Sequence, residues 1–109
     1  MFSRLATYNI IKLLGGDLKL SVPYRDTEEN CIEIRDKKQR KNILVQGIKT
    51  YSHNMISNPS VEQLIDLSEM VDALSEELGI QKHQLEKLKK KKNKKYGRYS
   101  RCFIKRSEL

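Results

Sequence analysis

Apolar and polar positions follow their most regular pattern in the second half of the chain. Between residues 60 and 79, apolar side chains recur at alternating steps of three and four, as on one face of a helix: Leu64, Leu67, Val71, Leu74 and Leu78. Ser60 suits the N-cap of this helix, and Gln63 three residues later completes a capping-box pattern. Gly79 provides the end. The pattern therefore predicts one unbroken helix before this glycine.

A second helix is predicted directly after this glycine. It runs from Lys82 to about Lys95, and Leu85 and Leu88 are its apolar anchors. The two helices together are expected to form a helical hairpin over residues 60–95. Residues 96–109 then form a basic tail that contains aromatic side chains.

The first half of the chain has shorter patterns. Ser3–Leu14 has apolar residues at roughly helical spacing and stops at Gly15-Gly16, which predicts a short first helix. Three segments then read as short strands: Leu18–Val22, Cys31–Arg35 and Asn42–Gln46. The polar residues 36–41 between the last two suit a hairpin connection, so a small β-meander is expected. Residues 47–59 favour neither helix nor strand.

Together these patterns predict a single domain over residues 1–109. It is expected to be mainly α, with a short β element in the N-terminal half and a helical hairpin in the C-terminal half that forms a bundle. With 38% apolar and 6% aromatic residues and no tryptophan, the core is expected to be small and aliphatic. We therefore expect a homo-oligomer that buries apolar residues of the predicted helix before Gly79 across a helical interface: Leu64, Leu67, Val71 and Leu74.

The net charge of +8 is unevenly distributed along the chain. Residues 87–106 hold eleven of the 22 lysine and arginine residues and no acid, so the rest holds eleven bases against fourteen acids, a net charge of −3. A basic end of this kind attracts phosphate, whether of nucleic acid, of a free nucleotide or of an anionic membrane surface. A second interpretation is a solubilising, partly disordered tail.

The two cysteines and the apolar segments give expectations about the compartment. Cys31 and Cys102 do not have the spacing of metal ligands, and reduced thiols are expected. The apolar residues 2–14 are interrupted by polar residues and have no cleavage-like end, and the apolar runs are too short to span a membrane. We expect a soluble cytoplasmic protein.

The predicted helix before Gly79 has an acidic face. Glu62, Asp66 and Glu69 stand at i, i+4 and i+7, so they share one side of the helix. Carboxylate clusters of this kind bind Mg²⁺, but a solvated helix face has the same spacing. The face lacks lysine partners at i+4, so its charges repel unless a cation is present. That cation could be Mg²⁺ or the protein's own Lys87–Lys95 block.

Residues 62–104 resemble the C-terminal half of the all-α nucleoside triphosphate pyrophosphohydrolases, the MazG and phosphoribosyl-ATP pyrophosphohydrolase-like group. That group has an E-x-x-D motif on a long helix, then a run like ALAEELGI, a helix with L-E and lysines, and a G-G-F segment with a basic residue. The matching residues here are Asp66, Ala73–Ile80, Leu85-Glu86, Gly97–Tyr99 and Arg101. Gln63 stands at the first acidic position of the motif. The family's earlier E-E-x-x-E helix has candidates only in Glu28, Glu29 and Glu33.

The resemblance implies a nucleotide- or phosphate-binding protein in which hydrolysis between the α- and β-phosphates is weak or lost. If hydrolysis survives, Mg²⁺ held by Asp66 with Glu62 or Glu69 polarises the phosphate and helps generate the hydroxide. The residues implied to bind phosphate are Lys91, Lys94, Lys95, Arg98 and Arg101. No catalytic residue is assigned, and whether the protein is an enzyme is left open.

Two alternatives belong to other classes of function. The residues around Gly79 also match a helix-turn-helix DNA reader, whose second helix enters the major groove with the residues Gln81, Lys82, Gln84 and Lys87. The long unbroken helix before this glycine is unusual for that motif. The third hypothesis is a small interaction or inhibitor module whose oppositely charged helices bind another macromolecule.

The tail interleaves aromatic and basic side chains. The aromatic residues are Tyr96, Tyr99 and Phe103, and they alternate with the basic residues Lys94, Lys95, Arg98 and Arg101. Aromatic rings can stack on bases while cations hold phosphates. The same rings can instead dock the tail on the rest of the protein, and the sequence does not separate the two.

Overall fold

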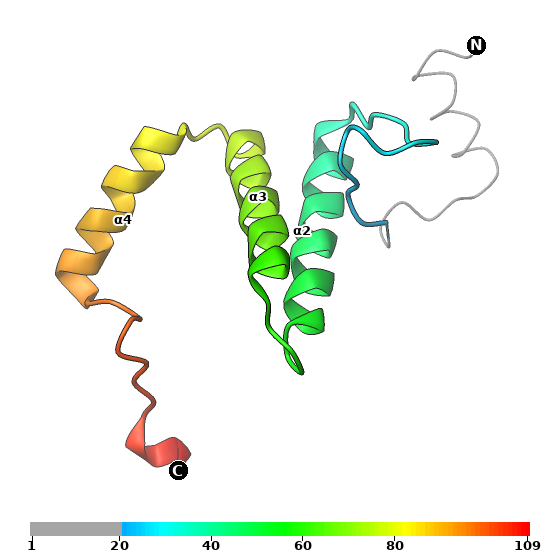
Figure 1. The fold of residues 1–109 in the computed structure, drawn as a ribbon. Helices are drawn as coiled ribbons and strands as arrows, with labels where there is room; N and C mark the ends of the chain where they lie inside the picture. Colours follow the sequence, from blue (N-terminus) through cyan, green and yellow to red (C-terminus); the bar gives the residue numbers. More distant parts are fainter. Residues whose placement is uncertain (1–20) are drawn as a thin grey trace. The chain divides into compact units, whose positions relative to one another are not determined.

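The computed structural model describes residues 21–109 (Figure 1). Three α-helices follow one another: α2 (Lys37–Asn54), α3 (Val61–Glu77) and α4 (Lys82–Tyr96), and a short 3-10 helix, η2 (Arg106–Glu108), ends the chain. The described chain is thus mainly helical, as predicted. The helix expected at residues 3–14 lies outside the described residues, and so does most of the first expected strand.

The β element expected in the N-terminal half is wrong. Residues 21–109 contain no strand: Cys31–Arg35 has neither helix nor ladder, and Asn42–Gln46 lies inside α2. The polar stretch taken for a hairpin connection is the first turn of that helix. Asp36 is its N-cap and accepts a hydrogen bond from the Gln39 backbone N–H at 3.0 Å. The N-cap and the run of lysine, glutamine and arginine favour a helix. This preference outweighs the strand preference of the short apolar run that follows.

The boundaries of α3 and α4 agree with the prediction. Ser60 caps α3 by accepting a hydrogen bond from the Gln63 N–H at 3.2 Å. The reciprocal bond of the capping box is not formed, because the buried Gln63 Oε1 has no partner in the described part of the chain. Gly79 follows α3 at a φ of +78°, a conformation that favours glycine. Gly97 ends α4 in a similar way, at a φ of +84°.

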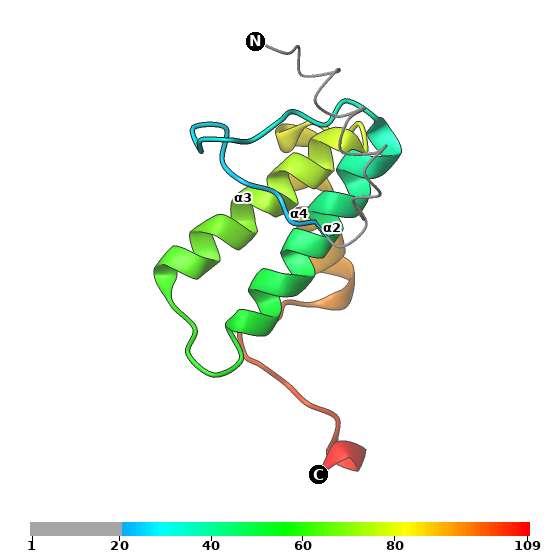
Figure 2. The same cartoon turned by 90° about the vertical axis from the view of Figure 1, so that its right-hand side faces the viewer.

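Helices α2 and α3 lie side by side and pack against each other (Figure 2). Ile43 on α2 is 8% exposed and is the one buried apolar side chain among residues 21–109. On α3, Leu67, Met70 and Leu74 are half-buried. The core is therefore thin, as the composition predicted.

The apolar stripe predicted on α3 is divided between two environments. Leu67 and Leu74 are half-buried, whereas Leu64, Val71 and Leu78 are 54%, 41% and 65% exposed. Met70 and the nearly buried Glu77 take part in the covered face, so that face is rotated from the predicted stripe. The homo-oligomer expected to cover the stripe stays a prediction.

An ion pair joins the start of α2 to the end of α3. Arg40 donates from Nε to Glu77 Oε1 and from Nη1 to the Ile34 carbonyl oxygen, the latter at 3.1 Å. The Glu77 side chain is only 12% exposed. Hydrogen bonds to a charged group in such a covered position are stronger than those at an open surface.

The chain divides into two compact units, Met1–Gly79 and Ile80–Leu109. The first holds the α2–α3 pair, and the second holds α4 and the C-terminal residues. We call the second the basic unit. Within residues 21–109, no helix combines the length and apolar character needed to cross a membrane.

A close approach at Gly47 gives a test of the packing. A Cβ at this position would lie 2.8 Å from Pro23 Cγ, 2.9 Å from Met70 Sδ and closer still to Pro23 Cδ. Gly47→Ala should therefore lower the free energy of unfolding by about 1 kcal/mol or more, because overpacking against a rigid ring outweighs the gain in helix propensity. Urea unfolding followed by circular dichroism measures this.

The matched control is Asn42→Ala on the exposed side of the same helix. It should leave the stability unchanged or raise it slightly, since alanine favours helix. If Gly47→Ala unfolds at the same or a higher urea concentration than the native chain, the contact between residues 21–30 and the helix pair is wrong.

Candidate functional site

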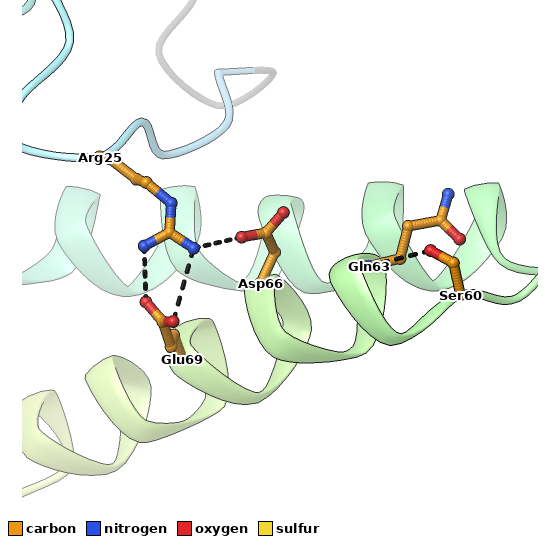
Figure 3. A network of polar contacts seen from close by, with 5 residues as sticks. All are labelled: Arg25, Ser60, Gln63, Asp66 and Glu69. Carbon is orange, nitrogen blue, oxygen red and sulfur yellow. Dashed lines mark hydrogen bonds and ion pairs between the residues drawn. The ribbon is translucent and has the colours of Figure 1, made fainter.

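Two of the three carboxylates on the acidic face of α3 bind one arginine (Figure 3). Arg25 lies ahead of α2, and its Nη1 donates to Glu69 Oε2 at 2.8 Å while its Nη2 bonds to Asp66 Oδ1. These two hydrogen bonds, Glu69 first, and the charges behind them raise the pKa of Arg25 above its usual value.

Arg25 is the cation that the acidic face required. The sequence predicted Mg²⁺ or the Lys87–Lys95 block for this role, and Arg25 is a third cation that the sequence did not identify. Glu62 is exposed on the same helix and is not part of this contact. The described residues contain no group of three or more His, Cys, Asp or Glu that could hold a metal ion. Arg25 bonds to Asp66 Oδ1 and to both carboxylate oxygens of Glu69, so Mg²⁺ at this face would compete with it, and the Mg²⁺ site stays a prediction.

The helix that faces α3 carries no acid. The sequence of α2 contains five lysine and arginine residues and neither aspartate nor glutamate. The resemblance to the pyrophosphohydrolases requires an acidic helix in this position to complete a metal site. The candidates Glu28, Glu29 and Glu33 all lie in the segment before α2. The acids that the resemblance requires therefore do not lie on the helix that packs against α3.

The basic residues form a surface of their own on α4. Lys87, Lys90, Lys91 and Lys94 stand at i, i+3, i+4 and i+7 and line one open hollow of about 740 Å³. We call these four residues the lysine face. Ile80, Gln84 and Leu88 also line the hollow.

The lysine face combines residues from two separate hypotheses. Lys91 and Lys94 were predicted to bind phosphate, and Gln84 and Lys87 were predicted to contact DNA. The structure brings these four together on one side of a single helix. The other predicted residues, Gln81, Lys82, Lys95, Arg98 and Arg101, belong to the same unit but do not line the hollow.

The side chain of Gln84 already has a local role. Its Oε1 accepts the Gln81 backbone N–H at 3.0 Å at the start of α4. A glutamine that reads adenine uses both its amide oxygen and its amide nitrogen. Gln84 can do so only by giving up a bond that stabilises the end of its own helix.

The aromatic side chains of the tail are exposed. Tyr96, Tyr99 and Phe103 are 71%, 97% and 74% exposed. Lys95 Nζ lies 5.1 Å from the centre of the Tyr96 ring, and Arg101 Cζ lies 4.7 Å from the centre of the Phe103 ring. Two of the three rings therefore have a cation of the same unit beside them.

Sequence reasoning missed Arg25 and Lys90. Arg25 is 41 and 44 residues from its two partners, and nothing near it in the sequence signals a distant contact. Lys90 lies three residues after Lys87 and four before Lys94, so helical spacing alone could have identified it.

The contact of Arg25 predicts how the protein responds to Mg²⁺. Millimolar Mg²⁺ should leave the thermal midpoint of the native chain unchanged, because the carboxylates already hold a cation. Arg25→Gln should lower the midpoint, since Asp66 and Glu69 then repel each other. It should also make the midpoint rise on addition of Mg²⁺. Differential scanning calorimetry with and without Mg²⁺ measures both effects.

Lys38→Gln is the matched control, because it removes one positive charge from an exposed position on α2. It should reproduce neither effect. A native chain whose midpoint rises with Mg²⁺ as much as that of the variant would contradict the interpretation.

Comparison of the chain with known protein families, with curated proteins and with solved structures found no match. The resemblance to the pyrophosphohydrolases therefore stays a prediction from the sequence.

Proposed function

We propose that this protein is a non-catalytic phosphate-binding protein whose basic unit binds the phosphate backbone of nucleic acid. The lysine face of α4 is the observation that carries the proposal. The basic unit holds twelve lysine and arginine residues against two acids, Glu86 and Glu108, a net charge of +10. Among residues 21–109, the ion pair of Glu86 with Lys89 is the only one on α4. The other lysines of the helix are thus available to an external anion.

The dimensions of the lysine face favour a polymer over a single nucleotide. Seven residues of helix separate its first and last lysines, a rise of about 10 Å. Duplex DNA presents one negative charge per about 1.7 Å of its axis, so a face of this length meets several phosphates. A nucleotide site is usually a concave pocket that covers most of its ligand. The hollow on α4 is open, and its lining surface is mostly apolar, with four lysines among the seven residues that line it.

The state of the carboxylates argues against hydrolysis. Asp66 and Glu69 are bound to Arg25, and α2 supplies no acid to face them. Binding of phosphate and its cleavage therefore have different requirements in this chain. The first needs only the basic unit, and the second needs carboxylates that are already engaged.

Sequence-specific reading of DNA is not part of the proposal. It depends on glutamine side chains at the start of α4, and the Oε1 of Gln84 accepts the Gln81 N–H. Contacts to phosphate need no such geometry, because lysine acts as a flexible point charge.

Replacing the lysine face tests the proposal. Lys87→Gln, Lys91→Gln and Lys94→Gln in one chain should weaken binding to a 20-nucleotide DNA on the order of tenfold at low salt. The slope of log K against log salt should fall by about 2, because each phosphate contact on a single strand contributes about 0.7. Fluorescence anisotropy over a salt series measures both quantities.

The control carries the same loss of charge elsewhere. Lys37→Gln, Lys38→Gln and Lys49→Gln on exposed positions of α2 should leave the salt slope close to that of the native chain. Glutamine and lysine have similar helix propensities, so both triple variants should fold. If the two lose affinity equally, net charge and not the lysine face determines binding.

Hydrolysis gives a second, independent test. With Mg²⁺ and a panel of nucleoside triphosphates, the native chain should release no more pyrophosphate than Asp66→Ala does. An enzyme-coupled pyrophosphate assay measures the rate. Turnover that Asp66→Ala abolishes would show that the carboxylates act on substrate in spite of Arg25.

A further inference from the structure

We propose that the basic unit prefers single-stranded to double-stranded nucleic acid, because Tyr99 and Phe103 stack on unpaired bases while the lysine face holds phosphates. This inference rests on the proposed function and names its ligand class. Its basis is the arrangement of aromatic and basic side chains after α4.

The first observation is exposure of large rings. Tyr99 is 97% exposed and Phe103 is 74% exposed, and Tyr96 at the end of α4 is 71% exposed. Three aromatic side chains within eight residues are exposed to water, so the protein lacks the favourable free energy of burying them. A ligand with flat apolar faces would recover it.

The second observation is that each ring follows a cation in the sequence. Lys95 precedes Tyr96, Arg98 precedes Tyr99, and Arg101 stands two residues before Phe103. Two of these cations lie over their rings, at 5.1 Å for Lys95 and 4.7 Å for Arg101. A single strand presents phosphates and bases in turn, so repeated pairs of a cation and a ring match its chemistry.

The two nucleic-acid forms separate the contributions of lysines and rings. Both forms carry phosphates, so the lysine face serves either one. The bases of a duplex are stacked on each other and offer their faces to no side chain, whereas unpaired bases can be stacked on aromatic rings. A preference for single strands must therefore come from the tail.

An anionic membrane surface fits the basic unit less well. A helix that lies on a membrane has its cations on one side and a broad apolar face on the other. The lysines of α4 surround the helix, since Lys89, Lys92 and Lys95 lie outside the lysine face. Its apolar anchors are only Leu85 and Leu88, so nucleic acid is the better match.

The experiment compares a 20-nucleotide single strand with its duplex. The full chain is titrated with each at low salt, first unchanged and then with Tyr99→Ala and Phe103→Ala together. The double variant should bind the single strand about tenfold or more weakly, and the duplex within twofold of the native chain. Tyr24→Ala, also exposed at 71% but outside the basic unit, should change neither affinity.

Tyrosine emission gives an independent signal, because the chain has five tyrosines and no tryptophan. Stacking should quench this emission when the single strand binds, and Tyr99→Ala should reduce the quenching. The duplex should quench it less.

The outcomes distinguish the inference from the function on which it rests. If the double variant binds both forms as tightly as the native chain, or loses both equally, the stacking inference is wrong while phosphate binding stands. If the native chain binds neither form, the proposed function fails as well. Binding to vesicles with anionic lipid but not to either DNA would overturn both in favour of a membrane partner.

Discussion

The contact of Arg25 with Asp66 and Glu69 links the fold of this chain to its chemistry. It fastens the segment before α2 onto α3, where Pro23 of the same segment lies against Gly47. The described residues contain one buried apolar side chain, so the helix pair has a small core. Ion pairs and hydrogen bonds therefore matter more to its stability than they would in a protein with a larger core. The same contact engages the carboxylates that a phosphate-cleaving site would need.

Positive charge is concentrated in the second of the two compact units. In the first unit three of the six acids of α3 pair with arginines from elsewhere in the chain, Arg25 with Asp66 and Glu69, and Arg40 with Glu77. The basic unit has twelve cations and only two acids with which to pair them. An external polyanion can therefore neutralise the positive charge of the basic unit, as arginines neutralise acids on α3. The polyanion releases its own counterions when it binds.

The sequence predicted those parts of the structure that depend on local signals. The ends of α3 and α4 follow from Ser60, Gly79 and Gly97, whose capping roles are set within a few residues. Residues 42–46 of α2 were predicted as a strand, because Ile43, Leu44 and Val45 are consecutive and by themselves show no helical period. The N-cap at Asp36 favours a helix over a strand in this segment. Arg25 had no local signal at all, since its partners are 41 and 44 residues away.

The three predicted kinds of site, for phosphate binding, catalysis and base reading, make different physical demands on their side chains. Neutralising phosphate requires only cations on one side of a helix, and the spacing of Lys87, Lys91 and Lys94 already places them there. Catalysis and base reading require particular atoms that are uncommitted to other partners. A sequence does not show which atoms already bond to other residues. In the structure Asp66 is bound to Arg25, and the Oε1 of Gln84 accepts a hydrogen bond at the start of its own helix. Both hypotheses share the electrostatic requirement, and the proposal of phosphate binding rests on that shared requirement.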